Sequence, residues 1–294
     1  MNNSFEKAPC YLCEKGDDHP VLLKGEPLIK GQFGYTIFPR ICKGCGLVYL
    51  NPRWNKNMYN ELYKEHYDEQ YRLENKPDYG IEGVILNMEE IWERIIGSCN
   101  DKYLGEIKNV LDVGCGSGYG LKYLKDQIGN IKIYGIESSP LCCRTLQSSE
   151  IGAKLVTTDF DSNWIESHLN RFDLIIMRHV LEHSLKPLEA LLKLKNVLSP
   201  DGIVYIAVPD MMHPRTVLRD YDQWWEYWFR AVHTYYFSKE TLFNTLDRVM
   251  LYPISFSEIN EEVWCVVTSD ISYQVCYEKN IYPKQIQVLN RFLP

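Results

Sequence analysis

The sequence lacks any hydrophobic run long enough to cross a membrane. None of its apolar stretches approaches the roughly 20 residues that span a bilayer. The first ten residues, MNNSFEKAPC, also lack the basic region and the apolar core of a secretory signal. We therefore expect a soluble, cytoplasmic protein without a membrane-inserted segment.

Dense clusters of lysine and arginine are also missing, as are internal repeats and low-complexity segments. The formal net charge is −7, whereas proteins that bind nucleic acids usually carry a basic face or stripe. Residues 1–55 hold seven Lys/Arg against five Asp/Glu, a difference of only two. A nucleic-acid partner is therefore disfavoured, and a small-molecule partner is expected.

Cysteine, by contrast, is abundant, and two C-x-x-C pairs stand near the N-terminus: Cys10/Cys13 and Cys42/Cys45. In a chain expected in the cytoplasm, such pairs predict metal binding rather than disulfides. Four thiolates close every position of a tetrahedral structural zinc site, so we assign this zinc no catalytic role. An empty or degenerate ribbon and an iron centre are the alternatives.

The apolar pattern divides the chain into four parts. Residues 105–270 alternate short apolar runs with amphipathic helices, which is typical of βαβ units around a buried parallel sheet. Right-handed connections of this kind give a doubly wound fold. The expected strands are 109–114, 132–137, 153–158, 173–177, 202–208, 251–258 and 263–269. The expected helices are about 118–127, 140–149, 162–168, 186–198 and 238–248, the last capped by Ser238. The other parts are a zinc ribbon over 1–55, a helical lid or linker over 56–104 and a C-terminal tail over 271–294.

The lid contains a regular row of tyrosines. Tyr59, Tyr63, Tyr67 and Tyr71 follow one another at four-residue spacing, which places the rings along one helix face. A second helix is expected at about 83–97 from the spacing of its apolar residues. The tyrosines either reach a ligand or pack the two parts of the protein together.

The segment VLDVGCGSGYG carries the strongest chemical signal. Gly114, Gly116 and Gly118 follow an apolar strand and open a helix, so the backbone can turn sharply and approach a ligand. A dinucleotide site needs G-x-G-x-x-G, and Tyr119 stands where its third glycine would fall. Asp112 before the loop would repel a pyrophosphate but suits an ammonium group.

Acidic residues also follow the next two strands. Glu137 can accept hydrogen bonds from ribose hydroxyls. Asp159 can accept one from an adenine amino group, and Phe160 beside it can stack on the base. Together with the glycine loop, these residues describe a ligand with an amino-acid end, a ribose and an adenine.

This ordered set resembles class I S-adenosylmethionine-dependent methyltransferases. The resemblance implies a Rossmann-like α/β fold, with a seven-stranded sheet whose last strand is antiparallel, and S-adenosyl-L-methionine as the methyl donor. The donor-binding residues are then expected to be Asp112, Gly114, Cys115, Gly116, Gly118, Glu137, Ser138, Asp159, Phe160 and Arg178.

The stretch MRHVLEHSLKP follows the fourth strand, near the expected reaction centre. His179 or His183, with Glu182 adjacent, is a candidate base for removing a proton from the acceptor. Alternatively, His179 packs against the donor and the Glu182/His183 pair is structural. The stretch also reads H-x-x-E-H, a zinc-hydrolase motif that needs a third ligand and a long helix. Pro187 ends any helix early, so we reject the hydrolase interpretation.

His233 is a further candidate for the acceptor site. Its segment, AVHTYYFSKETL, resembles one that borders the acceptor pocket in many methyltransferases, although bracing a loop is an equally good role. The nearby Trp224, Trp225 and Trp228 either line that pocket or cover the sheet.

The segment CKGCGLVYLNPRW resembles zinc-ribbon methyltransferases that act in bacterial sugar or polysaccharide biosynthesis. That resemblance implies a small acceptor such as a nucleotide-linked sugar, with Tyr63, Tyr67 or Tyr71 reaching the donor or the acceptor. The sugar C-methyltransferases usually carry a further large C-terminal domain, whereas about two dozen residues follow position 270 here. Transfer to an oxygen or a nitrogen therefore fits as well as transfer to carbon.

Three other functions remain open from the sequence. The first is an RNA methyltransferase that grips RNA with the ribbon. The second is a non-catalytic assembly protein that keeps the cofactor fold, and the third is an NAD-dependent oxidoreductase. The acceptor and the oligomeric state are not identified by the sequence.

Overall fold

The structure is a computed structural model of the 294-residue chain. It describes residues 4–15, 19–20, 22, 29–30, 36–63, 89–91, 93–95, 97, 105–212, 229–259 and 261–290. Tyr67 and Tyr71 lie outside the described residues, as do the three tryptophans at 224, 225 and 228. The predictions made for these five side chains therefore stay predictions.

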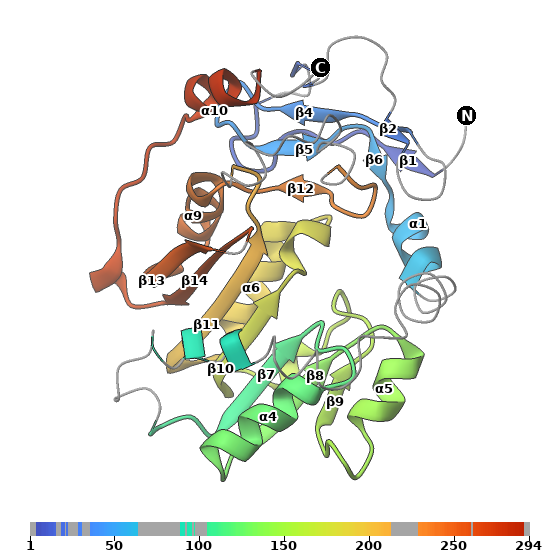
Figure 1. Cartoon of the computed structure of the whole chain (residues 1–294), viewed down its shortest axis with the longest axis vertical. Coiled ribbons are helices and arrows are strands. Elements are labelled where there is room, and N and C mark those ends of the chain that lie inside the picture. Colours follow the sequence, from blue (N-terminus) through green and yellow to red (C-terminus); the bar gives the residue numbers. More distant parts are fainter. Residues whose placement is uncertain are drawn as a thin grey trace.

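A seven-stranded sheet forms the centre of the molecule, in the order β13-β14-β11-β10-β7-β8-β9 (Figure 1). Strands β9, β8, β7, β10 and β11 pair in parallel, and β14 runs antiparallel to both β11 and β13. The strands are β7 Asn109–Val113, β8 Lys132–Ile136, β9 Lys154–Thr157, β10 Phe172–Arg178, β11 Leu198–Pro209, β13 Tyr252–Ile259 and β14 Glu262–Thr268. The predicted α/β sheet with a reversed last strand is confirmed.

The sheet is buried on both faces, which explains its nearly continuous apolar strands. In β7, Leu111 packs with residues of α6 and α9, whereas Val110 packs on the opposite face with residues of α4 and α5. Residues 89–95 add Ile91 and Ile95 to that second face. The helices are α4 Tyr119–Ile128, α5 Pro140–Leu146, α6 Pro187–Val197 and α9 Lys239–Arg248. Each fully buried Leu, Ile or Val contributes roughly 1.5–3 kcal/mol through burial.

Residues in the local sequence determine where three of these helices begin. Ser139 caps α5 by accepting a hydrogen bond from the backbone N–H of Cys142. Pro187 stands at the start of α6, where its missing N–H costs nothing. Ser238 caps α9 through a reciprocal pair of hydrogen bonds with Thr241, as its sequence predicts.

The predicted helix at 162–168 is wrong. Only a 3₁₀ turn, η4 Ile165–Ser167, forms there. The preceding residues hydrogen-bond locally instead, since the Ser162 hydroxyl donates to the Asp159 carbonyl at 2.6 Å. Such side-chain bonds compete with helix formation. Among the described residues, the two other 3₁₀ turns are η5 Leu181–His183 and η6 Ile271–Tyr273.

The N-terminal part forms small sheets, and one of these sheets includes a strand from much later in the chain. A three-stranded sheet has the order β12-β5-β4, and α10 packs against the same part, at the top of Figure 1. The two remaining sheets pair β1 with β6 and β2 with β3. The strands are β1 Phe5–Glu6, β2 Ile29–Lys30, β3 Thr36–Ile37, β4 Pro39–Ile41, β5 Val48–Leu50, β6 Arg53–Trp54 and β12 Tyr235–Tyr236, and the helices are α1 Lys56–Glu61 and α10 Tyr282–Leu289. The described residues of this N-terminal part therefore pack directly on the α/β domain.

No helix among the residues that the structure describes is both long enough and apolar enough to span a bilayer.

Candidate functional site

The glycine loop lies at the carboxyl end of β7 and depends on backbone angles that favour glycine. Gly114, Gly116 and Gly118 have φ values of 73°, 56° and 82°. A Cβ added to Gly114 would lie 2.6 Å from Cγ2 of Val180, which follows β10. Glycine is therefore required here both for the turn and for the close approach of the next loop.

Glu137 is fixed against this loop. Its Oε2 accepts a hydrogen bond from the N–H of Gly116 at 2.7 Å, and its Oε1 accepts one from the N–H of Ser139 at 2.8 Å. The side chain is buried, with 6% of its surface exposed. A carboxylate has about four acceptor positions, so two remain for a ligand. Ser138, half-buried, follows Glu137 in the same turn.

Asp112 occupies the half-buried end of β7. Burial and the neighbouring charge of Glu137 raise the pKa of Asp112 to about 8, while Arg178 opposes the shift. A cationic ligand group beside Asp112 would favour its ionised form. In the loop itself, burial raises the pKa of the Cys115 thiol, so Cys115 stays neutral and unreactive.

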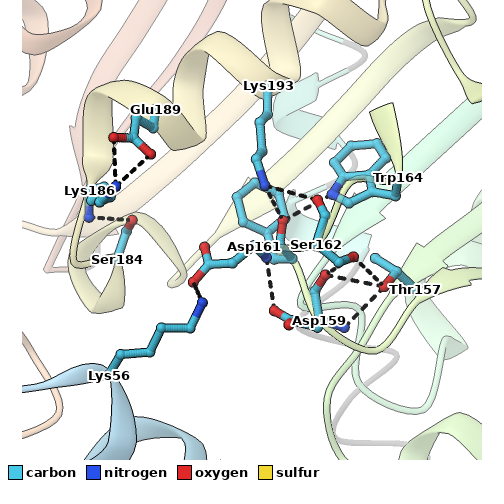
Figure 2. A network of polar contacts seen from close by, with 11 residues as sticks. Lys56, Thr157, Asp159, Asp161, Ser162, Trp164, Ser184, Lys186, Glu189 and Lys193 are labelled. Carbon is cyan, nitrogen blue, oxygen red and sulfur yellow. Dashed lines mark hydrogen bonds and ion pairs between the residues drawn. The ribbon is translucent and has the colours of Figure 1, made fainter. Parts of the chain in front are cut away.

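The turn after β9 carries Asp159 and Phe160. Figure 2 shows Lys193 reaching from α6 into this turn, where its Nζ donates to the Phe160 carbonyl at 2.8 Å. Trp164 Nε1 donates to the same carbonyl at 3.0 Å. Lys56 of α1 reaches the turn from the other side and pairs with Asp161 at 2.9 Å. These contacts hold the turn while the Asp159 side chain stays exposed.

Arg178 is the last residue of β10 and His179 follows it, and both contact Glu262. Nε2 of His179 lies 2.5 Å from Oε1 of Glu262, and Arg178 donates to the same oxygen. Arg94 lies 3.3 Å from the other oxygen. His179 has a φ of 53°, a left-handed conformation that is costly for a non-glycine residue. The Glu262 contact accounts for how this ring is held.

Sequence reasoning missed Glu262. It is the first residue of β14, and nothing in its immediate sequence marks it as part of a site. Because β14 is antiparallel to β11, its first residue pairs with Pro209 at the carboxyl end of the parallel strands. The reversal of the last strand therefore brings Glu262 to Arg178 and His179.

Glu262 is expected to contribute to the stability of the fold in a pH-dependent way. Burial would raise its pKa, but the hydrogen bond to His179 and the charge of Arg178 lower it from 4.5 to about 2. The contribution is therefore complete above pH 4.5 and is lost as the pH falls towards 2. Glu262→Gln is expected to lower the free energy of unfolding at pH 7 by roughly 3 kcal/mol, and by progressively less towards pH 2. Urea unfolding at several pH values measures the difference.

The matched control is Glu258→Gln. Glu258 lies on β13 and pairs with Lys239, but its side chain is 39% exposed. We expect a change of less than about 1 kcal/mol there. A deficit for Glu262→Gln that stays constant between pH 7 and pH 3 would contradict the assignment.

Glu182, His183 and His233 come together beside His179. Nε2 of His183 lies 3.6 Å from Oε1 of Glu182, and Nδ1 of His179 lies 3.9 Å from the same oxygen. The rings of His183 and His233 meet edge to face, with centroids 4.9 Å apart. Burial, with smaller effects of His183 and Arg230, lowers the pKa of His233 well below its ordinary value. The structure therefore brings all four predicted catalytic residues into one cluster.

The N-terminal part holds the loop that carries His233. The Tyr59 hydroxyl lies 2.5 Å from Oγ1 of Thr234 and also contacts the carbonyls of Ala231 and Val232. Arg53 donates to the Tyr235 hydroxyl at 2.6 Å and to the Leu185 carbonyl at 3.1 Å. Of the row of tyrosines, Tyr59 therefore positions the loop that carries His233. Tyr63 stacks on Tyr59.

The four cysteines Cys10, Cys13, Cys42 and Cys45 form one cluster, as predicted. Their sulfur atoms all lie within 4.8 Å of one another. The Cys10–Cys45 and Cys13–Cys42 separations are 3.6 Å and 3.3 Å. Tetrahedral zinc with Zn–S bonds of about 2.3 Å requires sulfur separations of roughly 3.8 Å. Both the donor set and the spacing therefore fit a structural zinc.

Comparison with known proteins agrees with the fold and the glycine loop. A family model described as a methyltransferase domain matches residues 86–249, more than half of the chain. Among curated proteins, the chain is 30% identical over 105 residues to a ubiquinone biosynthesis O-methyltransferase of Actinobacillus pleuropneumoniae serotype 7, covering 34% of this chain and 45% of that protein. It is 32% identical over 157 residues to a tRNA U34 carboxymethyltransferase of Histophilus somni, covering 51% of this chain and 41% of that protein. The chain thus spans less than half the length of either relative.

Among solved structures, the fold resembles an O-methyltransferase family protein from Burkholderia thailandensis, with a TM-score of 0.50 and 10% identity over 64% of this chain and 57% of that one. At this identity the likeness concerns the fold alone. The family match, the reversed seventh strand and the glycine loop with its acids agree. The chain belongs to the methyltransferase domain family, whose model matches residues 86–249.

Proposed function

We propose that the chain transfers a methyl group from S-adenosylmethionine to a small acceptor molecule. The observation that carries this proposal is the position of Glu137. Its buried carboxylate is fixed to the Gly116 N–H at 2.7 Å and keeps two acceptor positions for ribose hydroxyls. An NAD site would need G-x-G-x-x-G, and Tyr119 stands where its third glycine would fall.

The site offers a suitable binding group for each part of the donor. Asp112 would accept hydrogen bonds from its amino group, and the glycine loop lets the backbone approach it closely. The exposed Asp159 carboxylate and the Phe160 ring would bind the adenine. When bound, the donor supplies an electrophilic methyl group. The residues at the end of β10 would then orient the acceptor in line with that group.

The acceptor side is the cluster of Glu182, His183 and His233. His179 already has its Nε2 engaged by Glu262, so the reactive group of the acceptor would face the other members. His233 also lines a small cavity with Pro209 and Met211. A sugar, nucleotide sugar or phosphorylated metabolite is the acceptor we propose, supported by the resemblance of CKGCGLVYLNPRW to the ribbon methyltransferases of sugar biosynthesis.

We also propose that the four-cysteine cluster binds structural zinc. The sulfur separations of 3.3 and 3.6 Å support this metal. With four thiolate ligands the ion would have no open position, so its role is to hold the N-terminal part together.

Transfer to RNA is the alternative, and the name of the Histophilus somni relative favours it. A net charge of −7 and the small excess of basic residues in 1–55 speak against it. RNA binding that weakens steeply with salt, together with methylation of that RNA, would replace the small acceptor.

Calorimetry tests the donor assignment. We expect S-adenosylmethionine to bind the wild-type chain and NAD not to bind. Because Asp112 is protonated below about pH 8 and must ionise to hold an amino group, donor affinity should fall up to tenfold for each pH unit below 8. Asp112→Ala is expected to abolish binding.

Unchanged donor affinity in Asp112→Ala, or tighter binding of NAD than of S-adenosylmethionine, would contradict the proposal. The acceptor is then sought by screening nucleotide sugars and phosphorylated metabolites for release of S-adenosylhomocysteine. Tight donor binding without release from any acceptor, RNA included, would instead identify a non-catalytic assembly protein.

A further inference from the structure

A second group of potential metal ligands lies apart from the four cysteines. One ligand atom from each of Glu182, His183 and His233 lies within 4.8 Å of the other two. We propose that these three side chains bind a divalent transition metal ion at the carboxyl end of β10.

Glu182 is the first reason. Its side chain is 1% exposed, and among the described residues neither carboxylate oxygen has a hydrogen-bond partner. A buried carboxylate without a partner is strongly unfavourable. The 3.6 Å separation between its Oε1 and Nε2 of His183 is too long for a hydrogen bond. A metal ion in the cluster would satisfy this carboxylate.

The orientation of His183 is the second reason. Its Nδ1 lies 2.9 Å from the carbonyl oxygen of Val232, which can only accept a hydrogen bond. The proton therefore sits on Nδ1, and the lone pair of Nε2 faces Glu182. Imidazoles that bind metals are held in this way, with the second nitrogen donating to a backbone carbonyl.

His233 supplies the third ligand from a distant part of the chain. The sequence motif H-x-x-E-H offers no third ligand, and η5 is a short 3₁₀ turn rather than the long helix of zinc hydrolases. The loop fixed by Tyr59 instead brings the ring of His233 to within 4.9 Å of the ring of His183. Metal–ligand distances of about 2.1 Å require only a small inward shift of these side chains.

One carboxylate and two imidazoles suit Zn²⁺ and related ions, and three protein ligands leave an open position. If the proposed function holds, an oxygen atom of the acceptor would take that position, where the ion would lower its pKa and its proton would pass to solvent water. This metal ion would then act on the acceptor. The zinc ion that we propose at the four cysteines would have no open position for the acceptor.

Zinc stoichiometry of the full chain tests the proposal. We expect equilibrium dialysis against Zn²⁺, followed by elemental analysis, to give two equivalents in the wild type. Glu182→Gln and His233→Ala should each hold one, with zinc affinity at the lost site lowered at least 100-fold. His168→Ala is the control, because His168 stacks on Phe172 away from the cluster and should keep two.

A single equivalent in the wild type overturns the proposal, whether or not the variants fold. So does a count of two in folded Glu182→Gln and His233→Ala, with folding checked by circular dichroism. The count needs neither methyl donor nor acceptor. Its failure is therefore distinguishable from a failure of donor binding, which calorimetry measures separately.

Discussion

Cys42→Ser is expected to lower the metal content by one equivalent and to unfold the N-terminal part of the protein. Cys42 is buried, and its sulfur lies 3.3 Å from that of Cys13, so serine would leave a tetrahedral site with three thiolates. Structural zinc contributes about 10–16 kcal/mol of apparent binding free energy in small domains. Part of that free energy is lost with one ligand, and a loss of several kcal/mol exceeds what a small module can tolerate.

Elemental analysis and urea unfolding check this result. Cys276→Ser is the matched control, because Cys276 is exposed and is not one of the four clustered cysteines. We expect it to keep both the metal content and the stability of the wild type. Since Tyr59 and Arg53 position the loop of His233, methyl transfer by Cys42→Ser should fall as well. Identical zinc content and unfolding in Cys42→Ser and Cys276→Ser would rule out the metal site.

Gly116→Arg is expected to abolish binding of S-adenosylmethionine, with affinity lowered more than 100-fold. Gly116 has a φ of 56°, and its N–H holds Glu137 in place. An arginine there is strained in that conformation, and its long side chain would occupy the space into which the glycine loop admits a ligand. The same change would displace the carboxylate that we expect to bind the ribose.

The control separates backbone strain from loss of the site. Gly129 ends α4 with a φ of 91°, and a Cβ built there meets nothing within 4 Å. The backbone of Gly129 (φ 91°, ψ −112°) also favours glycine, so Gly129→Arg should cost roughly 1–3 kcal/mol of stability while donor affinity stays unchanged. Calorimetry on both variants, with thermal unfolding as a check of folding, decides the matter. Binding of S-adenosylmethionine by Gly116→Arg at the wild-type level would contradict the assignment of the glycine loop as the donor site.

The sequence predicts the α/β domain well because its signals are local. Short apolar strands alternate with amphipathic helices, and β7 ends one residue from its expected boundary. The glycine loop and Glu137 could be predicted for the same reason, because a sharp turn that approaches a ligand closely needs glycine at fixed positions in the local sequence. Ser238 marked the start of α9 through a bond made within one turn.

Contacts between distant segments could not be read in this way. Glu262 reaches Arg178 only because the last strand is reversed, and His233 reaches Glu182 only through the loop held by Tyr59. The pairing of β12 with β5 joins residues almost 190 positions apart, and no periodicity in the sequence indicates this pairing. α10 was missed because its apolar residues are few and spread over only eight positions.

The docking of α10 has a consequence for the order in which the protein folds during synthesis. All four cysteines have been made once residue 45 is complete, so metal capture can come early. Their surroundings are finished much later, because the N–H of Ile281 hydrogen-bonds the Cys45 carbonyl and Gln285 lies against Gly46. Contacts of such high sequence separation form slowly. The surroundings of the cysteines are therefore complete only once α10 has left the ribosome, and an early metal ion would hold the N-terminal segment in a shape ready to receive that helix.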